Sequence, residues 1–399
     1  MKKITILHHK DIILSVILSL FVVSLYFDLQ YVILSTILFL AIGAGFILYS
    51  LLGKKEKLRK PHPVVYGWLA VYLVRVIWLL ASNDVHYGLK WLDVCLPMLL
   101  FPIIFQHLSL SERVVKTVLT VFVHFTLLFC IITLVCAVYH SFTIPIDISE
   151  WLYHPKSHYP FAFKWTGYNH PSFLCIIYLF ALPASLYLRR RYHTISIAEI
   201  IILIVIETAV IAFTGARIGM AIFLLLFLMM LAYAVPLKRR IITPGLISAL
   251  LSVIVVILSL SGSQFIDRFK DPIREQLRKT AMASIKEEPL LGVGTGGMKA
   301  IIDTPEMTEI TGMAHSYPHN QYLGEVMHFG ITGAIPLFAT LIYLLIMAIR
   351  HKNFLLLSLM IILFVFMITE MPFDLYRGID YFLFFTSLLL FQRQRLLPA

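Results

Sequence analysis

The residues best suited to chemistry lie in one long segment, 262–330, of a chain that is otherwise almost entirely apolar. This segment holds cationic side chains, a glycine-rich run and a histidine-containing run: Arg268, Arg274, Arg278, Gly292–Gly297 and His315–Tyr322. Guanidinium groups bind phosphate oxygens through paired hydrogen bonds, and a histidine can accept a proton near neutral pH. The segment therefore predicts a site for an anionic substrate and for acid–base chemistry.

His315 and His319 are four residues apart, a spacing that binds zinc when both lie on one helical face. Pro318 breaks a helix between them and no glutamate follows His315, so we expect no metal there. His319 directly precedes a predicted helix start at Asn320 and is a candidate base. The alternative is a loop histidine that only makes hydrogen bonds.

Residues 267–286 have the spacing of an amphipathic helix, with one apolar face formed by Ile273, Leu277, Ala281 and Ile285. Arg274 and Arg278 lie one turn apart on a neighbouring face. Two interpretations remain open for these arginines, which can bind anionic lipid headgroups or the phosphate of a lipid-linked substrate.

The glycine-rich run Gly292–Gly297 lacks the Gly-Lys-Ser/Thr ending of a nucleotide-binding loop. We expect a tight turn with close backbone approach, and no ATP binding.

Arg217 lies just after the predicted span that ends at Phe213. In the run Phe213–Ile218, a Thr-Gly turn would hold the Arg217 guanidinium at the membrane interface. It either binds phosphate or reaches toward lipid headgroups.

The composition places the chain among membrane proteins, because 59% of its 399 residues are hydrophobic and only 14% are charged. Apolar stretches long enough to cross a bilayer recur about twelve times. The predicted spans are Asp11–Phe27, Tyr31–Leu52, Pro63–Ala81, Lys90–Gln106, Val114–Tyr139, Ser172–Leu188, Ile195–Phe213, Ile218–Val235, Ile242–Leu260, Ile331–Ile349, Phe354–Thr369 and Ile379–Phe391. The predicted fold is one all-α polytopic domain, 1–399, with a long, partly helical loop before the last three helices.

The net charge of +11 reflects membrane topology rather than nucleic-acid binding. Most of the 33 Lys and Arg fall in alternate loops, on the same side as the N-terminus. This asymmetry predicts that both termini are cytoplasmic and that the long loop faces outward. All four cysteines fall inside predicted spans, so neither disulfides nor a thiolate metal site is expected.

Arg75 and Glu207 lie inside predicted spans, where an unpaired charge costs several kcal/mol. We expect each to form a buried ion pair, with the other or with polar neighbours, that fixes helix packing. The alternative is that they line a substrate pathway.

Four motifs together resemble the superfamily of O-antigen ligases and O-antigen polymerases, which are polytopic membrane glycosyltransferases. They are Gly167–Pro171, Thr214–Arg217, Arg274–Gly294, and His319–Leu323 followed by Gly330–Gly333. Two positions depart from the pattern. Arg278 stands where the superfamily often has Trp, and His328 stands where it often has an acidic residue.

This resemblance implies transfer of a glycan from undecaprenyl diphosphate at the periplasmic face of a bacterial inner membrane, with no metal or cofactor. Arg217 and Arg274 would bind the diphosphate, and His319 would deprotonate or orient the acceptor hydroxyl. Substrate-binding roles are implied for Arg278, Asn320, His315, Asn169 and His170. The implied partners are the lipid-linked donor, a lipid A–core or glycan acceptor, and membrane lipids.

An O-antigen ligase that uses lipid A–core as acceptor is the expected activity. A polymerase of the same superfamily, which extends a lipid-linked repeat, would need nearly the same site. A transporter of lipid-linked sugars is a third hypothesis. It is disfavoured because the two halves of the chain show no repeat and polar residues gather in the outer loop.

Overall fold

The computed structural model describes residues 2–27, 33–34, 36–41, 43, 45, 60–108, 110–143, 171–214, 217–234, 272–305, 307, 309 and 317–392. The long helices in these ranges are α1 (Lys2–Ser24), α3 (Pro63–Ile77), α4 (Val85–Leu108), α5 (Glu112–Thr143), α7 (Pro171–Tyr192), α8 (Ile197–Thr214), α9 (Arg217–Ala234), α12 (Pro272–Glu287), α15 (Gln321–Arg350), α16 (Phe354–Phe366) and α17 (Tyr376–Leu390). Shorter helices are η1 (Trp78–Ala81), α13 (Gly297–Ile302) and η4 (Pro372–Asp374).

The chain is an all-α polytopic membrane protein, as predicted. Within the described ranges, five helices are long and apolar enough to cross a membrane: Pro63–Ala81, Val85–Leu108, Glu112–Cys136, Ser172–Tyr192 and Gln321–Arg350. The figure of about twelve spans stays a prediction, because Ile242–Leu260 and most of Tyr31–Leu52 lie outside the described residues.

The interior of the bundle is built around α7 and α17, whose side chains are almost all buried. Aromatic rings fill the space between them and their neighbours; Phe122, for example, packs on Phe385 with ring centroids 4.8 Å apart. The surrounding helices leave large apolar side chains exposed, such as Leu73 and Ile342. Such a surface fits contact with lipid tails, which are as apolar as these side chains.

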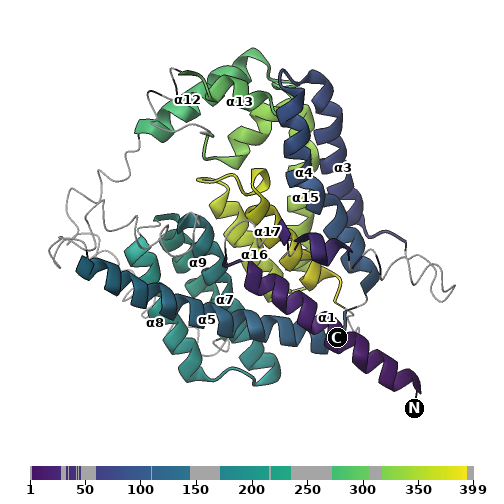
Figure 1. Cartoon of the computed structure of the whole chain (residues 1–399), viewed down its shortest axis with the longest axis vertical. Coiled ribbons are helices and arrows are strands. Elements are labelled where there is room, and N and C mark those ends of the chain that lie inside the picture. Colours follow the sequence, from purple (N-terminus) through teal and green to yellow (C-terminus); the bar gives the residue numbers. More distant parts are fainter. Residues whose placement is uncertain are drawn as a thin grey trace.

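Helices α12 and α13 lie together at one end of the molecule, beside the upper ends of α3 and α4 in Figure 1. We call this end the α12 end. Leu277 and Ala281 are buried there in a small second core, Ile285 is half-buried, and Ile273 is 38% exposed. The predicted apolar face of α12 is therefore confirmed in its central turns. The part of the predicted helix before Pro272 lies outside the described residues.

Helix α15 is longer than the predicted span Ile331–Ile349, because a polar first half precedes a kink at Gly330. Gly330 has φ 63° and ψ −176°, a conformation that only glycine adopts readily. Beyond the kink, the N–H of Ile331 donates to the Pro289 carbonyl at 2.9 Å, and that of Thr332 donates to Leu290 at 3.3 Å. The loop thus replaces the helical bonds that the kink breaks.

The glycine-rich run supplies hydrogen-bond donors to the carbonyls of α15 before the kink. The carbonyls of Met327 and His328, which the kink deprives of their helical donors, accept from Val293 at 3.0 Å and Gly294 at 2.9 Å. Gly294 has φ 83°, and a side chain there would meet the backbone of Ala81 at 2.7 Å. The predicted tight turn with close backbone approach is confirmed, and it fixes the α12 end against the kinked helix.

Candidate functional site

Arg274 of α12 and His319, just before α15, share one buried carboxylate, that of Glu370. The Arg274 guanidinium donates from Nη2 to Glu370 Oε1 at 3.3 Å and from Nη1 to the Thr369 carbonyl at 3.1 Å. His319 Nδ1 lies 3.3 Å from Glu370 Oε2. Glu370 is fully buried, whereas the Arg274 side chain is 25% exposed. The two residues expected to bind phosphate and to act on the acceptor are therefore adjacent.

The carboxylate also determines which ring nitrogen of His319 is left for chemistry. When the ring donates its Nδ1–H to Glu370, Nε2 remains as a proton acceptor. A carboxylate in this position also stabilises the imidazolium that forms when Nε2 takes up a proton. The arrangement of Glu370 and His319 therefore suits a general base.

The backbone around His319 is held in a constrained conformation. His319 has φ 50°, which is uncommon for a residue with a side chain and costs free energy. The next residue, Asn320, caps α15 by accepting from Leu323 N–H at 3.0 Å, and its amide donates to the Ile368 carbonyl at 3.1 Å. The helix start predicted at Asn320 is confirmed, and the side chain of Asn320 is engaged in holding this loop.

Tyr317 contacts both Glu370 and His319 and lines a cavity. Its ring centroid lies 4.2 Å from that of His319, and its hydroxyl donates to Glu370. Burial, reinforced by the charge of Glu370, raises the pKa of Tyr317, so the hydroxyl stays protonated. Tyr317 also lines the cavity.

The cavity has a volume of about 360 Å³ and lies between the upper part of α4, the start of α7 and the η4–α17 segment. Five aromatic residues line it: Tyr87, Trp91, Phe173, Tyr317 and Tyr376. Lys90, Asp374 and Arg377 supply charge. This volume lies within the range of about 300–1,000 Å³ that is usual for small-molecule sites, and aromatic walls with few polar groups are typical of them.

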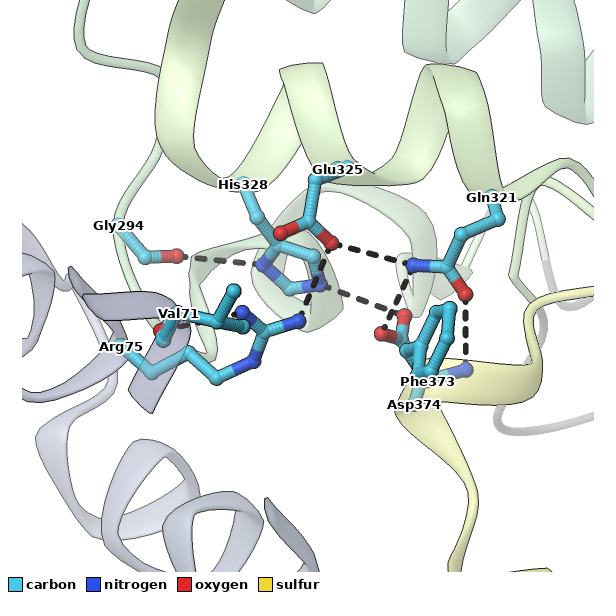
Figure 2. Close-up of polar contacts among 8 residues, drawn as sticks. All are labelled: Val71, Arg75, Gly294, Gln321, Glu325, His328, Phe373 and Asp374. Carbon is cyan, nitrogen blue, oxygen red and sulfur yellow. Dashed lines mark hydrogen bonds and ion pairs between the residues drawn. The ribbon is translucent and has the colours of Figure 1, made fainter. Parts of the chain in front are cut away.

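A second ionic network surrounds Arg75 of α3 (Figure 2). Arg75 Nη2 donates to Glu325 Oε2 at 3.2 Å, and both side chains are fully buried. The guanidinium also lies against two aromatic rings, 5.5 Å from the centroid of Trp91 and 5.1 Å from that of Phe329. The prediction of a buried ion pair is confirmed for Arg75.

Glu207 differs from Arg75. Its carboxylate is buried in α8 and has no hydrogen-bond partner among the described residues. Of the two expected alternatives, the structure shows pairing with a polar neighbour for Arg75, since Arg75 pairs with Glu325 and not with Glu207. Helical spacing identifies which side chains are buried, but it does not identify their partners on other helices.

The remaining predicted site residues fall into two groups. Arg278 lies on α12 with an exposed side chain, and α9 begins at Arg217, whose side chain is outside the described part. His315, Asn169, His170 and Arg268 lie outside the described residues altogether. Their predicted roles therefore stay predictions.

Three residues of the site, Glu370, Asp374 and Tyr317, were not predicted from the sequence. A signal was present, because Thr369–Asp374 follows a predicted span on the same side of the membrane as the long loop and contains two acidic residues. Asp374 also bears on one departure from the superfamily pattern. His328 Nε2 lies 3.8 Å from Asp374 Oδ2, so η4 brings a carboxylate close to the position where the superfamily often has an acidic residue.

Residues 200–338 match the model of a family described as O-antigen ligase. This stretch runs from α8 to the second half of α15 and contains three of the four motifs that carried the resemblance; Gly167–Pro171 lies before it. No curated protein matches the chain. The resemblance to the O-antigen ligase superfamily is confirmed for this part of the chain.

Proposed function

We propose that the protein is an O-antigen ligase that transfers a polysaccharide from undecaprenyl diphosphate to lipid A–core at the periplasmic face of a bacterial inner membrane. One observation carries the proposal. Arg274 and His319, 45 positions apart in the sequence, bind the two oxygens of one buried carboxylate beside an aromatic cavity. The family match over residues 200–338 supports the same conclusion.

The donor's diphosphate would bind at Arg274, together with Arg217 from the start of α9. As the bond between the anomeric carbon and the phosphate oxygen breaks, negative charge grows on the leaving diphosphate. Fixed guanidinium groups stabilise this charge, commonly by a few kcal/mol per donor. The partial exposure of Arg274 lets a phosphate approach it from outside.

The acceptor hydroxyl would attack the anomeric carbon from the opposite side, so the configuration there is inverted. Its proton passes to Nε2 of His319, whose Nδ1–H is held by Glu370. General-base assistance of this kind typically raises a rate by about 10²–10⁴. The glycosidic bond forms as the bond to the phosphate oxygen breaks, undecaprenyl diphosphate leaves as the anion, and His319 then returns its proton to water.

The proposal is tested by the lipopolysaccharide of a strain that lacks this protein, analysed beside its pool of undecaprenyl-linked glycan. We expect lipid A–core without its polysaccharide ladder, while long chains accumulate on the carrier. Expression of the wild-type protein restores the ladder, and the Arg217→Ala variant does not. Lipid A–core capped by a single repeat unit contradicts ligation and identifies a polymerase instead.

A further inference from the structure

The cavity at the α12 end contains a carboxylate that the proposed mechanism does not use. Asp374 of η4 lines the cavity, and its side chain is only 10% exposed. Its Oδ2 atom is buried and has no hydrogen-bond partner among the described residues. Burial, together with the nearby charge of Glu325, raises the pKa of Asp374 to about 7. A carboxylate that has lost water in this way gains much from a new hydrogen-bond donor.

The other oxygen of Asp374, Oδ1, contacts Gln321. Gln321 Nε2 lies 3.5 Å from Asp374 Oδ1 and 3.2 Å from Glu325 Oε2, and Gln321 Oε1 accepts the N–H of Phe373 at 2.9 Å (Figure 2). Glu325 is in turn bound by Arg75. The network therefore holds both the side chain and the backbone of η4. Oδ2 makes no hydrogen bond among the described residues and lies 3.8 Å from His328 Nε2.

The aromatic wall beside Asp374 is equally well supported. The Trp91 ring stacks on the His328 ring with centroids 4.7 Å apart and planes 17° from parallel. Tyr376 and Tyr87 line other parts of the cavity. Flat aromatic faces with a fixed hydrogen-bond acceptor provide what a sugar ring requires, since its C–H faces are apolar and its hydroxyls donate hydrogen bonds.

The position of the cavity favours the acceptor sugar over the donor. Tyr317 lines the cavity and contacts the ring of His319, the proposed base for the acceptor hydroxyl. Arg274 binds the other oxygen of Glu370, where the diphosphate is proposed to lie. The cavity lining holds Lys90 and Arg377 as well as Asp374, so the assignment to the acceptor rests on the contact with His319 and not on charge.

We propose that this cavity binds the acceptor sugar and that Asp374 accepts a hydrogen bond from one of its hydroxyls. The inference rests on the proposed glycosyl transfer, but it concerns binding of the acceptor and not of the donor. It assigns acceptor binding to α4, η4 and α17, outside the part of the chain that matches the family.

The test uses the full-length protein in lipid nanodiscs with undecaprenyl-diphosphate-linked glycan and lipid A–core, and KM is measured for each substrate separately. For Asp374→Asn we expect the acceptor KM to rise about tenfold, because the amide has no charge and only one oxygen that can accept, while the donor KM is unchanged. Tyr376→Ala should raise the acceptor KM as well, by a smaller factor. Glu275→Gln, which removes an exposed carboxylate on α12, is the matched control and should change neither KM.

An unchanged acceptor KM in Asp374→Asn, or a rise in the donor KM instead, overturns the inference while wild-type transfer still supports the proposed function. Absence of transfer by the wild-type protein overturns both. If Asp374→Asn does not fold, Tyr376→Ala decides, because an unchanged acceptor KM in that variant also contradicts the assignment.

Discussion

Two arginine–carboxylate pairs of nearly equal length lie at different depths in this protein. Arg75 and Glu325 meet at 3.2 Å with both side chains fully buried, and Arg274 and Glu370 meet at 3.3 Å with Arg274 25% exposed. This difference in solvent exposure suggests different roles for the two arginines. A substrate can reach Arg274, whereas described protein atoms enclose Arg75.

The residues around each pair support the same assignment of roles. The Arg75 guanidinium lies against Trp91 and Phe329, and its backbone carbonyl accepts from the Thr295 hydroxyl. It therefore connects α3, α15 and the glycine-rich run. Glu370, the partner of Arg274, also binds His319, whose ring can accept and release a proton. One pair organises the structure, and the other is part of the proposed site.

The largest effect is expected for His319→Ala, which removes the proposed base and leaves the deeper network intact. The transfer rate should fall by about 10²–10⁴, with the thermal unfolding temperature close to that of the wild type. Single-turnover transfer from a preloaded donor measures this directly. Transfer at a near-wild-type rate would show that His319 only makes loop hydrogen bonds.

Arg75→Met should act on stability instead. It leaves Glu325 buried without its cation, and breaking a buried pair in this way costs about 3–5 kcal/mol. We expect a marked fall in the unfolding temperature in detergent, and recovery of most of that loss in the double variant Arg75→Met with Glu325→Gln. A stable but inactive Arg75→Met protein would break the comparison, since Arg75 would then have a direct role in transfer.

A smaller effect is expected for Glu370→Gln. The amide oxygen can still accept the Nδ1–H of His319, but it no longer stabilises the imidazolium or the Arg274 guanidinium by charge. We expect kcat to fall about ten- to hundredfold, less than on loss of His319 itself, with a smaller change in the acceptor KM. An unchanged kcat would mean that Glu370 has no part in the reaction.

Several features of this arrangement could be predicted because they depend on local spacing. Four-residue spacing placed Leu277 and Ala281 on the buried face of α12, and the glycine pattern indicated the tight turn. The cost of a charge inside a membrane span identified Arg75 as a paired residue. Each of these inferences needs only the neighbouring sequence and the solvent in which the segment folds.

The partners of these residues could not be predicted in the same way. Glu325 is 250 positions from Arg75, and Glu370 is 96 positions from Arg274. Glu325 also lies in the first half of α15, where buried polar residues interrupt the apolar pattern that marks a span. Such contacts depend on how helices pack in three dimensions, which one sequence does not show.

The central claim is that Arg274 acts on the substrate and not on the fold, and Arg274→Ala tests it most directly. Transfer to lipid A–core and thermal unfolding are measured on the same nanodisc preparation, with Lys279→Ala, which removes an exposed cation of α12 paired with Glu275, as the matched control. We predict that Arg274→Ala loses transfer while unfolding near the wild-type temperature, and that Lys279→Ala retains most activity. Near-wild-type transfer by Arg274→Ala, or a loss explained by unfolding, would contradict the account.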